Sequence, residues 1–229
     1  MTDTISHPLA GPLDRGLNAL GLPLPPAVQR RLLSYLDLIA QWNRVYNLTA
    51  IRDPGSMLVQ HLLDCLAIVQ PLRREAGQAG EGSSGLKAGC RVLDVGSGAG
   101  LPGVVLAICE PEWSVTCVDA VAKKASFIRQ VAAELQLTNL TATHQRVEDM
   151  DDAPFDLITS RAFATLSDFI SLTTARLAPG GRWVAMKAHL SPEERAGVPA
   201  NVEVFHVEPL TVPGLDAARC LVWMRPQAG

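Results

Sequence analysis

The chain is poor in aromatic residues and carries no excess of positive charge. Aromatic side chains make up 5% of its 229 residues, so few rings are available on which nucleic-acid bases could stack. The formal net charge is −3, which argues against a protein covered with positive charge for nucleic-acid binding. A local basic face is still compatible with this balance, because an RNA enzyme needs only a few cations beside its site.

Cysteines are also few. Their number is odd and their spacing matches no metal-binding motif, which argues against a disulfide framework and predicts buried thiols with no metal site. The start of the chain has no basic-then-apolar leader, and we find no apolar run that approaches a membrane span. We therefore expect a cytoplasmic protein without a membrane partner. The cysteines are Cys65, Cys90, Cys109, Cys117 and Cys220.

What the chain does have is a cluster of glycines directly after an apolar segment. Residues 92–103 read Val-Leu-Asp-Val-Gly-Ser-Gly-Ala-Gly-Leu-Pro-Gly. The apolar residues suit a buried parallel strand, the glycines leave bare backbone for a ligand, and Pro102 suits the first turn of a helix. Since open α/β sheets bind ligands where strands end and helices begin, this segment predicts a cofactor site.

Two cofactors fit this turn. Gly98-x-Gly100-x-x-Gly103 matches the dinucleotide pattern, which alone is a weak signal. Asp94, two residues before Gly96, completes instead the Asp-x-Gly-x-Gly-x-Gly pattern that methyltransferases using S-adenosylmethionine (SAM) share. A carboxylate there suits the ammonium group of SAM and would repel a pyrophosphate.

A second acid ends the next predicted strand. Asp119 follows Ser114–Val118 and is placed to accept hydrogen bonds from ribose hydroxyls, which both cofactors carry. Asp94 therefore decides for SAM, and a nucleotide-dependent oxidoreductase is the alternative from another class.

The chain divides into four predicted parts: a flexible N-terminus, a helical extension, a flexible glycine-rich joint and a SAM-binding methyltransferase domain. Their bounds are 1–24, 25–74, 75–89 and 90–229. One short helix is expected near residues 13–20 and a long one over 25–46, where apolar residues recur at helical spacing. A further helix is predicted to begin at Asp53-Pro54 and to end at Pro71.

Strands and helices alternate in the last part. The predicted strands are 91–95, 114–118, 141–145, 155–160 and 182–187, and the predicted helices are 102–109, 122–136 and 166–177, the last closed by Pro179-Gly180-Gly181. Two further strands, 202–207 and 220–224, suit a closing antiparallel pair. This order predicts an α/β, Rossmann-like methyltransferase fold with a mostly parallel, doubly wound sheet.

The segment after the fourth strand indicates the acceptor. It lacks the (Asp/Asn)-Pro-Pro-aromatic turn of amine methyltransferases, and no cysteine follows such a strand to attack cytosine. Ribose 2′-O methylation could use Lys187, but Ser160-Arg161 stands where the partner acid should be. Guanine N7 remains, because its free lone pair needs no general base. Arg161 would then lie beside the acceptor or the cofactor, or would form a structural ion pair.

Several motifs occur together in one order along the chain. They are Trp42-Asn43, Tyr46-Asn47-Leu48-Thr49, His61-Leu-Leu-Asp64, Asp94–Gly103, Arg146-Val147-Glu148, Ser160–Ala164 and Met186-Lys187. With them, the chain resembles the bacterial 16S ribosomal RNA guanine-N7 methyltransferases of the glucose-inhibited-division-B family over about residues 28–225. It departs from that family's pattern at Cys65, at Ala188 and in the glycine-rich residues 75–89.

The resemblance implies SAM as donor and a guanine in the 530 loop of 16S rRNA as acceptor. It also implies a cofactor site lined by Gly96, Leu101, Val147, Glu148 and Arg161. Together with the residues argued above, the expected cofactor set is Asp94, Gly96, Gly98, Gly100, Leu101, Asp119, Val147, Glu148 and Arg161, and Arg161 is the expected catalytic residue, acting by positioning.

Four residues are candidates for RNA contact, and three of them have an alternative structural role. His61 suits an RNA contact as well as a structural hydrogen bond, Phe163 suits base stacking or burial, and Arg146 suits phosphate or a structural ion pair; Lys187 is the fourth candidate. Trp42 and Tyr46 are expected to pack in the core. The expected partner is 16S rRNA within the small ribosomal subunit or its precursor, with no obligatory protein partner. A SAM-binding RNA module without catalysis is a further alternative.

Overall fold

The protein is built around one seven-stranded sheet. The computed structural model describes residues 5–77, 89–161, 163 and 165–227. The strand order is β3-β2-β1-β4-β5-β7-β6, with β1 to β5 parallel and β7 antiparallel to both its neighbours. The strands are β1 (Arg91–Val95), β2 (Ser114–Asp119), β3 (Leu140–His144), β4 (Phe155–Ser160), β5 (Leu177–Lys187), β6 (Val202–Leu210) and β7 (Arg219–Pro226).

This topology places a ligand site at the carboxyl ends of β1 and β4. The chain runs from β1 outward through β2 to β3 and then returns to β4 on the other side of β1. The order of strands therefore reverses between β1 and β4, and open α/β sheets bind ligands at such a switch point. The predicted α/β fold and its antiparallel pair are confirmed.

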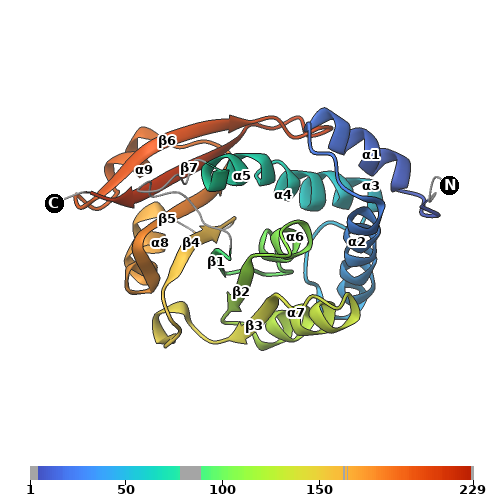
Figure 1. Ribbon diagram of the computed structural model, residues 1–229, viewed down its shortest axis with the longest axis horizontal. Helices are drawn as coiled ribbons and strands as arrows, with labels where there is room; N and C mark the ends of the chain where they lie inside the picture. The colour runs from blue at the N-terminus through green and yellow to red at the C-terminus, as the bar shows by residue number, and fades with distance from the viewer. Residues whose placement is uncertain (1–4, 78–88, 162, 164, 228–229) are drawn as a thin grey trace.

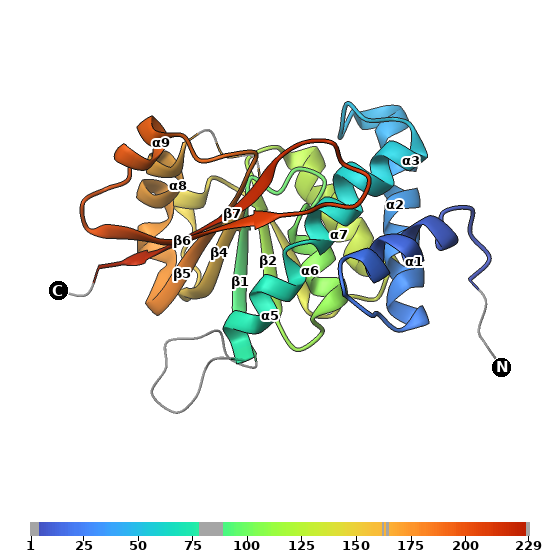
Figure 2. The same ribbon diagram turned by 90° about the horizontal axis from the view of Figure 1, so that it is seen from above.

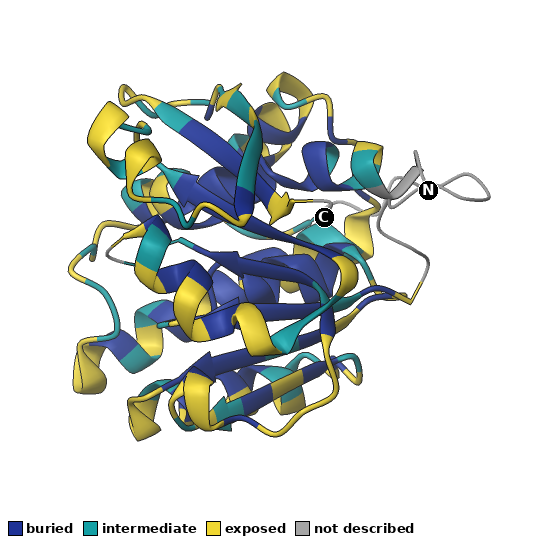
Figure 3. Cartoon of the chain, turned by 90° about the vertical axis from the view of Figure 1, so that its left-hand side faces the viewer, coloured by how far each residue is buried: buried dark blue, intermediate teal, exposed yellow. Residues whose placement is uncertain are grey.

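Helices cover both faces of the sheet (Figures 1 and 2). Helices α6 (Gly103–Cys109) and α7 (Ala122–Glu134) lie on one face and α8 (Leu166–Thr173) on the other. Neighbouring residues of β1 face opposite ways: Val92 belongs to the core on the α6 side and Leu93 to the core on the α8 side. The central strands are therefore buried on both faces, as Figure 3 shows.

The predicted helix over residues 166–177 ends early. Helix α8 stops at Thr173, and Pro179 to Gly181 lie inside β5 instead of closing a helix. The Thr173 hydroxyl accepts a hydrogen bond from Trp183 Nε1 at 2.8 Å and donates one to the Phe169 carbonyl at 2.5 Å. These bonds tie the end of α8 to the sheet, a tertiary contact that sequence spacing does not reveal.

The N-terminal helices form an additional layer over α6 and α7. They are α1 (Ala10–Ala19), α2 (Pro26–Tyr46), α3 (Pro54–Met57), a π-helix (Leu58–Leu63), α4 (Asp64–Leu66) and α5 (Val69–Gly77); a short helix, α9 (Pro192–Ala196), lies near the other edge. The expectation of a loose segment over residues 1–24 is wrong for α1. Leu13 and Leu17 lie on one side of α1, and Leu22 follows the helix. All three are at most 2% exposed, because they pack into the core that also contains residues of the sheet.

Two further expectations about this layer need correction. Pro71 does not end a helix: it lies in the first turn of α5, where the missing N–H of proline has no helical partner to lose. Helix α5 also continues to Gly77, and residues 78–88 of the predicted joint lie outside the described residues. The helical run Pro54–Glu75 is long and apolar enough to cross a membrane by length and composition, contrary to expectation, but 72% of its apolar window is buried inside the fold.

Candidate functional site

A first cavity lies at the carboxyl ends of β1, β2 and β3, and we call it the β1–β3 cavity. Its volume is about 170 Å³. It contains six of the predicted site residues: Gly96, Asp119, Arg146, Val147, Glu148 and Phe163. The other lining residues are Val95, Val118, Ala120, Gln145 and Leu172. Because each group of lining residues follows a different strand, the parallel sheet brings together four short segments of the sequence.

The glycines of the turn after β1 serve two different purposes. Gly96 and Gly98 have φ values of +66° and +61°, and a Cβ at Gly96 would meet no heavy atom within 4 Å. Gly100, in contrast, packs against the core, where a Cβ would lie 2.4 Å from Val104 Cγ2. Gly98, Gly100 and Leu101 line neither of the cavities described here. The open side of the turn is therefore at Gly96.

Asp94 is fully buried beneath this turn. Its Oδ2 accepts a hydrogen bond from the Gly103 amide at 2.9 Å, which ties β1 to the start of α6, while its Oδ1 has no hydrogen-bond partner. Burial raises the pKa of Asp94 to about 7. The carboxyl group thus has one structural oxygen and one buried oxygen without a partner, and Asp94 lines neither of the two cavities described here.

Asp119 stabilises the rim of the β1–β3 cavity. Its Oδ2 accepts from the Gly98 amide and its Oδ1 from the Val121 amide, both at 2.9 Å, and Lys124 Nζ lies 3.6 Å from Oδ2. Each carboxylate oxygen keeps a second lone pair, so Asp119 can still accept from a ligand hydroxyl. The sequence analysis missed a second support for the turn: the buried Tyr35 of α2 donates a hydrogen bond to the Ala99 carbonyl at 2.6 Å.

The far wall of the β1–β3 cavity comes from the segments after β3 and β4. Val147 is 6% exposed, while Arg146 and Glu148 are exposed and lie 3.5 Å apart as an ion pair. Phe163 packs against Phe169, with ring centroids 5.6 Å apart. Phe163 therefore belongs to the wall of this cavity. The sequence analysis had considered only base stacking or burial for it.

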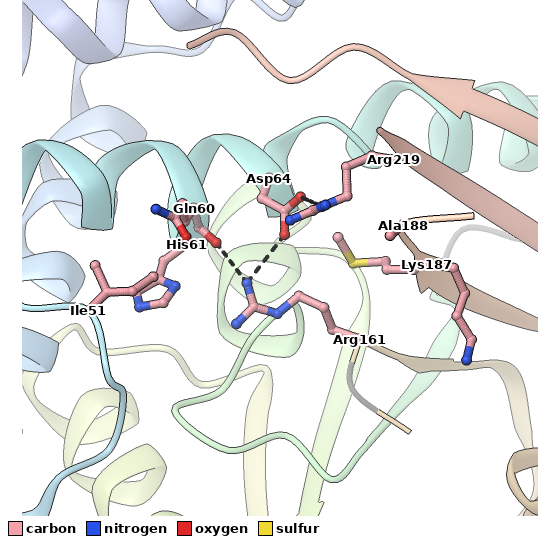
Figure 4. Close-up of a pocket in the computed structure, with 9 residues that line it drawn as sticks. Ile51, Gln60, His61, Asp64, Arg161, Lys187, Ala188 and Arg219 are labelled. Atoms are coloured by element: carbon pink, nitrogen blue, oxygen red, sulfur yellow. Dashed lines mark hydrogen bonds and ion pairs between the residues drawn. The ribbon is translucent and has the colours of Figure 1, made fainter. Parts of the chain in front are cut away.

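A second cavity, of about 390 Å³, lies around Arg161, and we call it the Arg161 cavity (Figure 4). It holds the predicted residues Arg161, His61 and Lys187. Its other lining residues are Ile51, Gln60, Asp64, Met186, Ala188 and Arg219. Arg161 is the first residue after β4, and Phe163 stands two residues later. The segment after β4 therefore contributes to both cavities.

Asp64 joins two arginines from distant parts of the chain. Its Oδ2 lies 3.3 Å from Arg161 Nη1 and its Oδ1 accepts from Arg219 Nε at 2.9 Å. Arg161 also donates to the Gln60 carbonyl at 2.9 Å. The ion pair foreseen as the structural alternative for Arg161 is thus present, but it holds the guanidinium in the cavity wall, as Figure 4 shows.

His61 and Lys187 are also held by partners. His61 Nε2 lies 3.0 Å from Thr49 Oγ1, and burial, followed by the charge of Arg161, lowers the pKa of His61 to about 4. Lys187 Nζ lies 2.6 Å from Glu194 Oε1. The argument against ribose 2′-O methylation from a missing acid beside Lys187 is therefore wrong, because Glu194 of α9, which no motif marks, is such an acid.

Three functional candidates were therefore missed or underrated: Asp64, Arg219 and Glu194. Asp64 stands one helical turn after His61, but the two side chains bind different partners. Arg219 reaches the cavity because Cys220 of β7 pairs with Lys187 of β5, which places the start of β7 at the carboxyl end of β5. Only the antiparallel register brings Arg219 there.

Comparison with known proteins identifies the family. The family model described as rRNA small subunit methyltransferase G matches residues 28–222. The chain belongs to this family. A relative from Methylibium petroleiphilum, named ribosomal RNA small subunit methyltransferase G, is 57% identical over 216 residues, which cover 94% of each chain. A relative of the same name from Leptothrix cholodnii is 56% identical over 213 residues, which cover 93% of this chain and 94% of that one.

Solved structures support the fold. A SAM-dependent methyltransferase from Aquifex aeolicus is similar with a TM-score of 0.52 and 16% identity, over 75% of this chain and 93% of that one. TrmN from Thermus thermophilus is similar with a TM-score of 0.54 and 20% identity, over 71% of this chain and 48% of that one. The predicted Rossmann-like methyltransferase fold is therefore confirmed.

Proposed function

We propose that this protein transfers a methyl group from SAM to N7 of a guanine in the 530 loop of 16S rRNA, in the cytoplasm. The observation that carries the proposal is the pair of cavities that both include residues of the segment after β4. The β1–β3 cavity has the acids and open backbone that suit a nucleoside, and the Arg161 cavity has the cations that suit RNA. Membership of an rRNA methyltransferase family supports the same reaction.

The residues at the strand ends fit SAM. The unpartnered Asp94 Oδ1 suits its ammonium group, Asp119 suits its ribose hydroxyls, and the open side of Gly96 leaves room for it. Val147 and Glu148 suit the adenine edge, with Phe163 packed beside them. When bound, SAM supplies a methyl group on a positively charged sulfur, which is ready for attack by a lone pair.

The Arg161 cavity favours an acceptor that needs no deprotonation. Among the described residues that line it, each titratable side chain is engaged: Asp64 with two arginines, Lys187 with Glu194, and His61 Nε2 with Thr49. Guanine N7 carries a free lone pair, so alignment and electrostatics suffice for its methylation.

Arg161 then acts by positioning. Held by Asp64 and the Gln60 carbonyl, its guanidinium keeps N–H donors for guanine O6 or a phosphate, and a donor on O6 leaves N7 free. Arg219 and Lys187 add positive charge to the same cavity, which suits the RNA backbone. The poverty of aromatic residues suggests that the shape of folded rRNA in the small subunit or its precursor contributes most to recognition.

The test is direct. Small subunits from a strain that lacks the gene are incubated with the protein and methyl-labelled SAM, and their nucleosides are analysed by mass spectrometry. We expect one 7-methylguanosine, mapped to the 530 loop by strand cleavage at methylated purines. A methylated ribose or a different base would refute N7 as the acceptor. Calorimetric binding of NAD without binding of SAM would refute the cofactor, and equal methylation of a short loop oligonucleotide would refute recognition of the folded particle.

A further inference from the structure

The end of α2 presents an aromatic ring to solvent. Tyr46 is 41% exposed and its neighbour Val45 is 71% exposed. The expectation that Tyr46 packs in the core is wrong, because α2 ends at this residue and Asn47, with a φ of +48°, turns the chain away. Trp42, one helical turn earlier, is half-buried and packs against the core, in agreement with the expectation for that residue.

The ring of Tyr46 is firmly backed. Its centroid lies 5.1 Å from that of Trp42, with the ring planes at 31°, and Trp42 lies 5.4 Å from the fully buried Phe127 of α7. A row of three rings therefore leads from the core to the surface. Ring packing of this kind restricts the Tyr46 side chain before any ligand arrives, so that little conformational entropy is lost on binding.

Hydrogen bonds connect Asn43, in the turn of α2 before this ring, to the Arg161 cavity. Asn43 of α2 accepts a bond from the Thr49 amide at 2.9 Å, and Thr49 Oγ1 lies 3.0 Å from His61 Nε2 in the cavity wall. Ile51, whose amide donates to Thr49 Oγ1 at 3.2 Å, lines the cavity itself (Figure 4). The loop after α2 thus holds the ring at a set position relative to the cavity.

Exposed cations accompany the ring. Arg52 donates a hydrogen bond at 3.0 Å to Oδ1 of Asn47, the residue that follows Tyr46. Arg44 is exposed in the last turn of α2. Lys123 is exposed one turn before Phe127 on α7. The neighbouring acid, Asp53, caps α3 by accepting from the Ser56 amide at 2.7 Å. A ring with flanking cations is the arrangement that binds single-stranded nucleic acid.

We infer that Tyr46 stacks a base of single-stranded RNA close to the methylated guanine, while Arg52 contacts its backbone. Resting on the proposed function, this inference adds a second, stacking contact to the cation-rich cavity. The occupant is RNA because continuity with the Arg161 cavity and the positive charge around the ring both favour a polyanion whose bases carry exposed π faces.

Kinetics with small subunits from the deletion strain test the inference. We expect Tyr46→Ala to raise KM for the subunit about tenfold and Tyr46→Phe, which keeps the ring, to stay near wild type. The calorimetric affinity for SAM should be unchanged, and Val45→Ala is the matched control in the same turn. An unchanged KM for Tyr46→Ala, or an equal loss with Tyr46→Phe, would overturn the inference. A wild-type protein that methylates no rRNA would instead refute the proposed function.

Photo-crosslinking gives a readout that does not depend on a truncated side chain. With p-benzoylphenylalanine at position 46 of the full chain, irradiation of the complex with small subunits should crosslink to rRNA within a few nucleotides of the methylated guanine. Crosslinks to a ribosomal protein, to a second copy of this chain or to distant rRNA would each overturn the inference.

Discussion

The two cavities are assembled in different ways. The wall of the β1–β3 cavity comes from short segments that directly follow β1, β2, β3 and β4, with one residue of α8. The Arg161 cavity instead combines the loop after α2, the π-helix, the first residue of α4, the ends of β4 and β5 and the start of β7. The wall of the first cavity therefore depends mainly on the parallel sheet, with Tyr35 of α2 supporting its glycine turn, whereas the second also takes wall residues from the N-terminal layer and depends on the β5–β7 register. Substitutions in one cavity should therefore have different effects on SAM binding and on rRNA methylation from substitutions in the other.

The substitution of Arg161 should have the largest effect on the rate of rRNA methylation. Arg161→Ala is expected to lower kcat/KM for rRNA methylation by about 100- to 1,000-fold, because a positioned donor at the acceptor is lost. Asp64 keeps Arg219 as a partner, so thermal unfolding should change little. SAM affinity, measured by calorimetry, should stay within about threefold of wild type. A loss of SAM affinity as large as the loss of rate would assign Arg161 to the cofactor.

Gly96 should decide cofactor binding. Gly96→Ala places a methyl group on the open side of the turn and should weaken SAM binding by about tenfold to 100-fold, measured by calorimetry. Gly180→Ala is the matched control, because Gly180 has a similar φ of +76° and equally open space but lies inside β5, away from both cavities. Both variants should lose about 1–2 kcal/mol of stability from the left-handed backbone. Equal SAM affinity in the two variants would contradict the assignment.

Asp64 should act on kcat more than on KM. Asp64→Asn removes the charge that orients two arginines, so kcat should fall about tenfold. KM for the subunit should not rise, since the cavity becomes more positive. Glu203→Gln is the control, because Glu203 of β6 pairs with Arg225 Nε at 2.9 Å and lines neither cavity. A higher KM with an unchanged kcat would show that Asp64 does not position the acceptor.

Cofactor affinity should depend on pH through Asp94. With a pKa of about 7 in the free protein, Asp94 holds its proton at lower pH, and a bound ammonium favours the carboxylate and so releases that proton. SAM affinity should therefore rise by up to about tenfold per pH unit between pH 5.5 and 7 and then level off. Calorimetry in two buffers of different ionisation enthalpy measures the proton release. Asp94→Asn should abolish both effects, and a flat profile in the wild type would contradict them.

Much of the fold and of the β1–β3 cavity was predictable because the signals are local. Asp94 and Gly96 stand within three residues of each other at a strand end, and Asp119 ends the next strand. A parallel sheet places such ends together whatever else the chain does. The N-terminal helix around Leu13 was underrated, since its leucines acquire their role only from the core that they enter.

The composition of the Arg161 cavity could be predicted only in part. Arg161 was found because it follows a strand, but its ion pair with Asp64 spans 97 positions of the sequence. Arg219 lies 155 positions from Asp64, and no spacing rule relates residues at such separations. Tyr46 shows the opposite error, since its apolar spacing predicted burial and the end of α2 exposes it.

By itself, the order of residues determined the alternation of strands and helices, the glycine turn and the acids at the strand ends, because these follow from local backbone preference and side-chain chemistry. Tertiary packing decided which cations surround Arg161 and which ring is left outside. Those outcomes depend on the register of β7 against β5 and on how α2 packs over α7, which are set by the packing of the whole core.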